Sequence, residues 1–327
     1  MTSESDASSG VSLDSHESRP MKVVQRDVAA DHVVTLVLEP TGSGLLPRWE
    51  PGAHVDLLLE NGLERQFSLC GDPKDQTRWR VAVLREQMSR GGSSFIHDYL
   101  HEGDVVEVRG PRNNFDLIHS DSYLFIAGGI GITPILPMLF DVAQRGADFE
   151  LVYSGRTLTS MAFVDEVSVF NERASIRPKD QLGRVDIPAL LSKVRPGTLV
   201  YCCGPEGLLQ EVERASAHWP VDSLHLERFA PKPDEGHENH EFEVVLNGSD
   251  ETHVIPADKT ILGVLSEAGH DLYFSCTEGT CGTCETPVIE GEIDHRDSVL
   301  SRSEQERGDV MMICVSRCRG KRLVLDL

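Results

Sequence analysis

The 327-residue sequence predicts a multidomain fold that combines α+β parts with an α/β part. Short Val- and Leu-rich runs fill residues 21–117, which indicates a small antiparallel barrel. Over residues 118–228, apolar runs alternate with helical patterns, as in a parallel sheet covered on both faces. The third part, 241–327, has short strands around CTEGTCGTC at 276–284, a loop with three cysteines in nine residues.

The N-terminal part begins with a polar segment. Residues 1–20 contain seven serines and no apolar core, so we expect a disordered tail and not a signal peptide. Gly, Pro, Asp and Asn punctuate the strands that follow. One helix is expected within the barrel, with an apolar face formed by Phe95, Ile96, Tyr99 and Leu100.

The central part should begin with the strand SYLFIAGG, which ends in glycines. The next helix is predicted to have Thr133 as its N-cap, Pro134 in its first turn and Gly146 after its end. A polar stretch with two prolines, residues 229–240, is typical of a linker. Beyond it we expect a hairpin around Asn247-Gly248 and a helix that Thr260 caps.

Charge and hydropathy narrow the function classes. The formal net charge is −22, from 53 acidic and 31 basic residues, which argues against nucleic acid or an anionic membrane as a partner. No stretch approaches the roughly 20 apolar residues of a membrane span. We therefore expect a cytoplasmic protein, in which structural disulfides are rare.

Four of the eight cysteines follow the spacing C-x4-C-x2-C-x29-C, namely Cys276, Cys281, Cys284 and Cys314. This spacing is typical of plant-type [2Fe–2S] clusters. The small residues between the first three let the backbone wrap closely around a cluster. Zinc is the alternative, because Cys281, Cys284, Cys314 and Cys318 also have plausible zinc spacing. Zinc would leave Cys276 without a role, so the pattern favours the cluster.

Two glycine-containing turns follow apolar strands of the central part. AGGIGITP at 127–134 joins a strand to a helix start, where backbone N–H groups and the helix dipole suit a pyrophosphate. CCGP at 202–205 ends another strand, and such ends form the ligand crevice of open α/β sheets. A tight turn without a ligand is the alternative for the first stretch. In the barrel, RQFSL at 65–69 and RGGSSF at 90–95 are polar stretches suited to an anion.

Taken in this order, RQFSL, RGGSSF, GGIGITP, YCCGP and the cysteine spacing resemble the phthalate dioxygenase reductase family. The resemblance covers about residues 21–327. It implies a six-stranded antiparallel flavin-binding barrel at 21–117, a parallel-sheet NAD-binding domain at 118–228, and a β-grasp plant-type ferredoxin domain at 241–327. The implied cofactors are FMN in preference to FAD, NADH in preference to NADPH, and a [2Fe–2S] cluster.

The resemblance also implies roles for individual residues. Those expected at the flavin ring and phosphate are Arg65, Phe67, Ser68, Gly91, Gly92, Ser93 and the aromatic Phe229. Those expected at the nicotinamide dinucleotide are Gly128, Gly129, Gly131, Thr133, Pro134, Arg156, Gly204 and Pro205, with Cys203 beside the nicotinamide ring as the catalytic candidate. Phe67 replaces the usual tyrosine and Leu84 a frequent lysine, which puts a flavin hydrogen bond and a phosphate cation in doubt.

The function that the resemblance implies is electron transfer from NADH through FMN and the cluster to a Rieske-type oxygenase or an O- or N-demethylase. Residues 241–327 contain 17 acidic and 8 basic residues, so we expect transient electrostatic docking of a monomer onto a basic partner surface. A diiron hydroxylase or a cytochrome is the alternative acceptor. A zinc-stabilised binding module without enzymatic activity is the alternative of another class.

Overall fold

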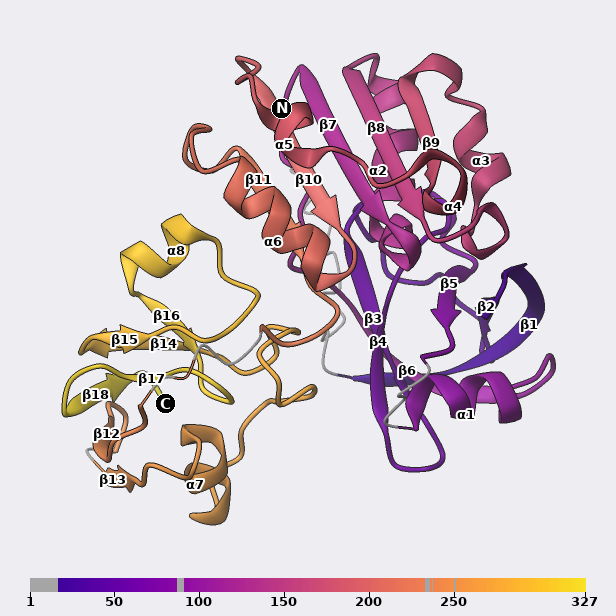
Figure 1. Ribbon diagram of the computed structural model, residues 1–327. Coiled ribbons are helices and arrows are strands. Elements are labelled where there is room, and N and C mark those ends of the chain that lie inside the picture. Colours follow the sequence, from indigo (N-terminus) through magenta and orange to yellow (C-terminus); the bar gives the residue numbers. More distant parts are fainter. Residues whose placement is uncertain (1–16, 87–90, 233–235, 237, 250) are drawn as a thin grey trace, which may run out of the picture.

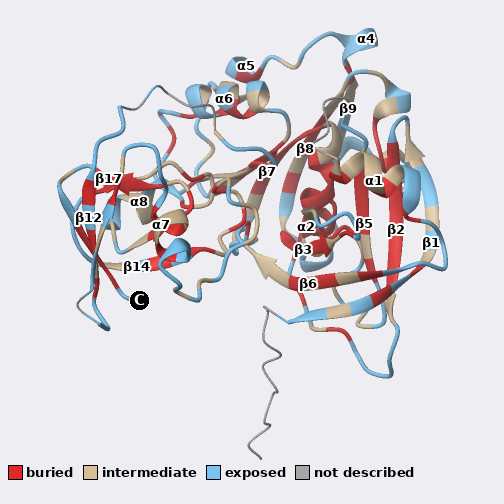
Figure 2. Cartoon of the chain, turned by 90° about the horizontal axis from the view of Figure 1, so that it is seen from below, coloured by how far each residue is buried: buried red, intermediate tan, exposed pale blue. Residues whose placement is uncertain are grey.

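The computed structural model describes residues 17–86, 91–232, 236, 238–249 and 251–327. Three large sheets follow one another along the described chain, with a small two-stranded sheet, β15-β17, in the C-terminal part. Figure 1 shows the first two large sheets on one side of the molecule and the third beside them. Buried residues line the strands of all three parts (Figure 2). Residues 233–235 and 237 of the predicted linker lie outside the described part of the chain. No helix in the described ranges is long and apolar enough to cross a membrane.

The first sheet is antiparallel, with the strand order β4-β3-β6-β1-β2-β5. A bridge between Leu69 and Val81 joins the strands at its two edges, so the sheet curls into a nearly closed barrel. The first strand begins at Ser18, inside the segment predicted to be a tail. Its elements are β1 (Ser18–Ala30), β2 (Val33–Pro40), β3 (Ala53–Leu58), β4 (Glu64–Ser68), β5 (Trp79–Leu84), α1 (Gly92–Tyr99) and β6 (Val105–Asn113).

The second sheet is parallel, with the strand order β11-β10-β7-β8-β9. One face packs on α2 and α3, and the other on α5 and α6, as the alternating pattern predicted. The strands are β7 (Ser122–Gly128), β8 (Asp148–Gly155), β9 (Ala174–Pro178), β10 (Thr198–Cys203) and β11 (Leu224–Glu227). The helices are α2 (Ile132–Arg145), α3 (Val164–Ser168), α4 (Lys179–Leu182), α5 (Ile187–Leu191) and α6 (Glu206–Ala215), with single 3₁₀ turns at Gly129–Gly131, Leu158–Ser160 and Asn171–Arg173.

The start of α2 differs from the prediction. Gly131, and not Thr133, is the N-cap residue, because the chain enters the helix from a 3₁₀ turn. The Thr133 hydroxyl lies inside the first turn and donates to the Ile130 carbonyl at 2.9 Å. The end of the helix is as expected, with Gly146 in the left-handed conformation at φ 74°.

The third part is a mixed sheet of order β13-β12-β18-β14-β16, in which β12 and β18 are parallel. Thr260 caps α7 as predicted, since its hydroxyl accepts from the Gly263 amide at 3.0 Å. Its elements are β12 (Phe242–Leu246), β13 (Thr252–Ile255), α7 (Ile261–Glu267), β14 (Glu285–Glu290), β15 (Ile293–Asp294), α8 (Arg302–Arg307), β16 (Val310–Met312), β17 (Arg317–Cys318) and β18 (Arg322–Leu325).

Candidate functional site

The four cysteines of the predicted cluster converge. Cys276, Cys281 and Cys284 lie on the loop between α7 and β14, and Cys314 lies just after β16. The thiols of Cys281 and Cys314 lie close enough to Cys276 to lower its pKa, and the thiol of Cys314 lowers the pKa of Cys284 in the same way. The structure therefore gathers sulfur ligands from one loop and one distant strand, as a binuclear cluster requires.

The backbone of the loop turns its amides toward the sulfurs. The amides of Glu278 and Thr280 donate to Cys276 Sγ at 3.3 and 3.4 Å. The Thr283 amide donates to Cys281 Sγ at 3.4 Å. Gly279 has φ 67°, and a Cβ there would lie 2.6 Å from the Val315 side chain, so glycine is required for this wrap. Such amide donors suit the charge of cluster thiolates and help to set the reduction potential.

Cys318, the fourth ligand of the zinc alternative, has another partner. Its Sγ donates to the Arg322 carbonyl at 3.4 Å, and it packs in the core of the third part. Burial raises the pKa of its thiol. The described residues thus fit the [2Fe–2S] ligand set and not the zinc set.

The predicted nucleotide residues surround one cavity of about 970 Å³. Leu84, Arg85 and Glu86 of the barrel form one side of it, so it lies between the first and second parts. The predicted residues on its wall are Gly128, Gly129, Arg156, Gly204, Pro205 and Phe229. Four further cations line it without having been singled out from the sequence: Arg177, Lys179, Arg184 and Arg228. A long cavity with glycine turns at strand ends and nearby cations suits a dinucleotide.

Three predicted residues lie beneath this wall and not on it. A Cβ on Gly131 would lie 2.3 Å from the Cys203 carbonyl oxygen, so Gly131 allows the two turns to pack together. Thr133 is 2% exposed, and Pro134 is buried within α2. These three residues pack beneath the turn that carries Gly128 and Gly129 and set its shape.

Cys203 is not at the mouth of the crevice, contrary to the sequence-based expectation. Its side chain is fully buried, and Sγ lies 3.7 Å from Glu227 Oε2. Burial raises the pKa of the Cys203 thiol well above its ordinary value. Burial also raises the pKa of Glu227 to about 8. At neutral pH the raised pKa keeps this thiol in its protonated form, which is a weaker nucleophile than a thiolate.

The flavin residues predicted from two separate stretches come together. A Cβ on Gly92 would lie 2.4 Å from the Arg65 side chain, which places the arginine against the start of α1. Gly91, at φ 94°, is the N-cap of α1. The Ser93 hydroxyl accepts from the Glu86 amide at 3.1 Å, whereas Ser89 and Arg90 lie outside the described residues.

Strand β4 offers further features that suit a flavin. Phe67 is half-buried and Ser68 is buried, on opposite faces of the strand. Gln66, which precedes Phe67 on this strand and which the sequence did not single out, has a buried Nε2 without a hydrogen-bond partner among the described residues. An unpaired buried donor beside these residues is what a polar ring edge would satisfy. Arg85, next to the Leu84 that replaces a frequent lysine, is paired with Asp98 at 2.7 Å.

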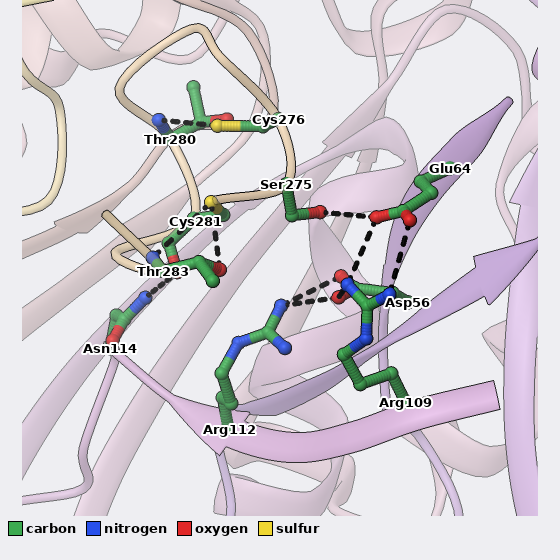
Figure 3. A network of polar contacts seen from close by, with 10 residues as sticks. All are labelled: Asp56, Glu64, Arg109, Arg112, Asn114, Ser275, Cys276, Thr280, Cys281 and Thr283. Carbon is green, nitrogen blue, oxygen red and sulfur yellow. Dashed lines mark hydrogen bonds and ion pairs between the residues drawn. The ribbon is translucent and has the colours of Figure 1, made fainter. Parts of the chain in front are cut away.

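Two hydrogen bonds connect the cysteine loop directly to the barrel (Figure 3). Asn114 Nδ2 donates to the Cys281 carbonyl at 2.8 Å. The Ser275 hydroxyl donates to Glu64 Oε2 at 3.0 Å. Glu64 is the first residue of β4, which also carries Arg65, so the cysteine loop contacts the strand on which flavin-binding residues are predicted.

A buried charged network supports this contact from within the barrel (Figure 3). Asp56 is fully buried and accepts two hydrogen bonds from Arg112 Nη2, at 2.8 and 2.7 Å. Arg109 donates to both carboxylate oxygens of Glu64 at 3.2 Å. Sequence reasoning missed these residues, and the available signal was the run of charged residues inside strands that otherwise alternate apolar positions.

Known proteins share these features. Residues 244–319 match the family of 2Fe-2S iron-sulfur cluster binding domains. Phthalate dioxygenase reductase from Burkholderia cepacia is 37% identical, over 94% of this chain and 97% of its own length. Vanillate O-demethylase oxidoreductase from a Pseudomonas species is 38% identical, over 92% of this chain and 97% of its own length.

Solved structures of known proteins are also similar to this chain. A solved structure of phthalate dioxygenase reductase, described as a modular structure for electron transfer from pyridine nucleotides to [2Fe–2S], is 37% identical with a TM-score of 0.68, and the match covers 94% of this chain and 97% of that one. An intact type IV self-sufficient cytochrome P450 monooxygenase is 44% identical with a TM-score of 0.90. This chain spans 41% of that protein's length. With its cluster ligands, three-part fold and full-length relatives, the chain belongs to the phthalate dioxygenase reductase family of FMN-, NAD(H)- and [2Fe–2S]-binding oxidoreductases.

Proposed function

We propose that this chain is the reductase component of an oxygenase system and passes electrons from NADH to a Rieske-type oxygenase or demethylase. The observation that carries the proposal is the position of the barrel, which borders the dinucleotide cavity on one side and is hydrogen-bonded to the cysteine loop through Asn114 and Glu64. FMN, when bound, accepts electrons in a pair and passes them on singly, which a two-electron donor and a one-electron cluster require.

The residues that line the cavity would bind NADH, the electron donor. Gly128 and Gly129, on the wall of the cavity, would hold the pyrophosphate, and Arg156, just after β8, would bind the adenosine ribose. Phe229, which is 48% exposed, also lines the cavity. Cys203 contributes through its backbone, against which Gly131 packs, and not through its thiol.

The residues of the barrel hold the flavin in place. Arg65 and the start of α1, with Gly91, Gly92 and Ser93, would bind the phosphate. Phe67 would contact the ring, and Ser68 lies at the end of the same strand. We propose the same division of the chain as the sequence predicted, with the linker at 229–240.

Docking to the oxygenase is electrostatic and transient in this proposal. Residues 241–327 carry 17 acidic and 8 basic side chains, so a basic surface on the partner would be steered toward the cysteine loop. The protein acts as a cytoplasmic monomer. Reduction of the partner should slow as ionic strength rises, and a rate that is flat from low to high salt would contradict the steering.

One experiment tests the proposed function as a whole. The purified chain is mixed with NADH and a Rieske-type oxygenase, and reduction of the oxygenase is followed by its visible spectrum. Wild type should reduce it, and the Cys314→Ser variant should oxidise NADH with ferricyanide but fail to reduce the oxygenase. If the variant without a cluster reduced the oxygenase as fast as wild type, the proposed electron path would be wrong.

A cytochrome P450 is the second candidate acceptor. The observation that favours it is the 44% identity and TM-score of 0.90 to part of a self-sufficient cytochrome P450 monooxygenase. Parallel assays with a P450, read out by formation of its ferrous carbon monoxide complex, and with a Rieske-type oxygenase separate the two acceptors. The true partner is the one that is reduced at low protein concentration in a salt-dependent reaction.

A further inference from the structure

Three side chains converge on the edge of the ferredoxin part, away from the cysteine loop. Glu251 precedes β13, His253 lies on β13, and His270 follows α7, which packs against that strand (Figure 1). Among the residues that the structure describes, they form a group whose possible ligand atoms all lie within 4.8 Å of one another. The two histidine Nε2 atoms are 3.2 Å apart, and Glu251 Oε2 is 3.5 Å from each.

These three distances match the edges of a tetrahedral metal site. With zinc–nitrogen and zinc–oxygen bonds of about 2.0–2.2 Å, adjacent ligand atoms of a tetrahedron are about 3.3 Å apart. A hydrogen bond between the imidazoles explains the 3.2 Å distance alone. It leaves the carboxylate oxygen 3.5 Å from both rings without a good hydrogen bond to either. A shared cation explains all three distances together.

The backbone holds the two histidines in place without a metal. His253 is paired with Val244 in the β12–β13 ladder. After α7, Gly269 adopts φ 94°, and the His270 amide donates to the Leu265 carbonyl at 3.1 Å, which closes a Schellman motif. Ligands that regular elements position lose little conformational entropy when a metal binds.

We propose that Glu251, His253 and His270 bind one first-row divalent cation, for which zinc is the best-fitting probe. Two imidazoles and a carboxylate suit zinc, copper and nickel, and the fourth position is left for water. The imidazoles are 17% and 27% exposed and the carboxylate 57%, so the ion enters from the solvent side. Binding ties the β12–β13 hairpin to the end of the helix that leads into the cysteine loop. This inference does not depend on the electron acceptor.

The test uses the full holoprotein, produced without a polyhistidine tag, and added zinc. After dialysis against a weak chelator, zinc per chain is measured by elemental analysis, and its ligands by X-ray absorption at the zinc edge. The variants are His253→Gln and His270→Gln, and the matched control is His218→Gln, an exposed histidine of the second part. Cluster absorption and iron content check that each variant is folded.

We expect one zinc per wild-type and control chain, with a nitrogen and oxygen shell and imidazole outer scattering. Each variant should bind zinc more weakly by at least the roughly 10–100-fold that loss of an outer-sphere partner costs. Zinc should raise the melting temperature of wild type and control but not of the variants. Equal zinc binding by wild type and both variants, or a sulfur-only shell, would overturn the proposal.

Discussion

The Asn114→Ala variant tests whether the contact between the cysteine loop and the barrel controls electron transfer. The substitution removes the hydrogen bond from Asn114 Nδ2 to the Cys281 carbonyl, which is 2.8 Å long and joins positions 167 residues apart in the chain. A hydrogen bond of this kind contributes about 0.5–1.5 kcal/mol net, so the docked population should fall by roughly 2- to 13-fold relative to the undocked one. Ser275→Ala removes the hydrogen bond from the Ser275 hydroxyl to Glu64. The double variant should lose more of the docked population than either single variant.

Stopped-flow absorbance separates the steps. After mixing with NADH, flavin reduction should keep its wild-type rate, because Asn114 lies outside the dinucleotide cavity. Cluster reduction, followed at wavelengths where the flavin absorbs little, should slow in proportion to the lost docked population. Asn247→Ala is the matched control, since its amide bonds to Asp326 within the third part. Unchanged cluster reduction in both Asn114→Ala and the double variant would refute the reasoning.

Three further predictions concern the cysteines, the buried carboxyl and the cofactor phosphate. Cys314→Ser should lose the cluster and its iron, whereas Cys318→Ser should keep both, because Cys318 Sγ bonds to a carbonyl and not to the cluster loop; iron content and visible absorption distinguish them. The free energy of unfolding should fall as pH rises from about 4.5 to about 8, since folded Glu227 keeps a proton that the unfolded chain releases. Denaturant titrations should show that Glu227→Gln removes up to about 1.4 kcal/mol per pH unit of that slope, and an identical slope would contradict the burial of this carboxyl. Arg156→Ala should leave the KM for NADH within about twofold but raise the KM for NADPH more, because a guanidinium pairs with a 2′-phosphate. An equal rise in KM for both dinucleotides would place Arg156 away from the 2′-phosphate.

Local signals in the sequence predicted the order of elements well. Thr260 was expected to cap α7 and does so, and Gly146 ends α2. The cap of α2 was wrong because the chain reaches it through a 3₁₀ turn whose geometry is imposed by packing of Gly131 against Cys203. Periodicity and capping preferences describe a helix and its neighbours, and they do not include a contact from another strand.

In the candidate site, too, the sequence predicted some features and missed others. The glycines of the nucleotide turns were found because close approach of backbone to a phosphate needs small residues within a few positions. The burial of Cys203 was missed, because it depends on Glu227 in the neighbouring strand and on the carbonyl packing of the turn before α2. A cysteine at a strand end looks the same in sequence whether its thiol faces a ligand or the core.

The sequence by itself predicted the cluster ligands, because the spacing of Cys276, Cys281, Cys284 and Cys314 reflects how a short loop and a distant residue must wrap a small inorganic core. It also determined the succession of barrel, parallel sheet and ferredoxin-like part. Only the tertiary structure decided that the cysteine loop rests on the barrel. Ser275 is bonded to Glu64 of β4, the strand that carries the predicted flavin residues, and Cys281 is bonded to Asn114, which follows β6. The physical reason is that such contacts join distant segments by single hydrogen bonds and packing, which leave no periodic pattern in the chain.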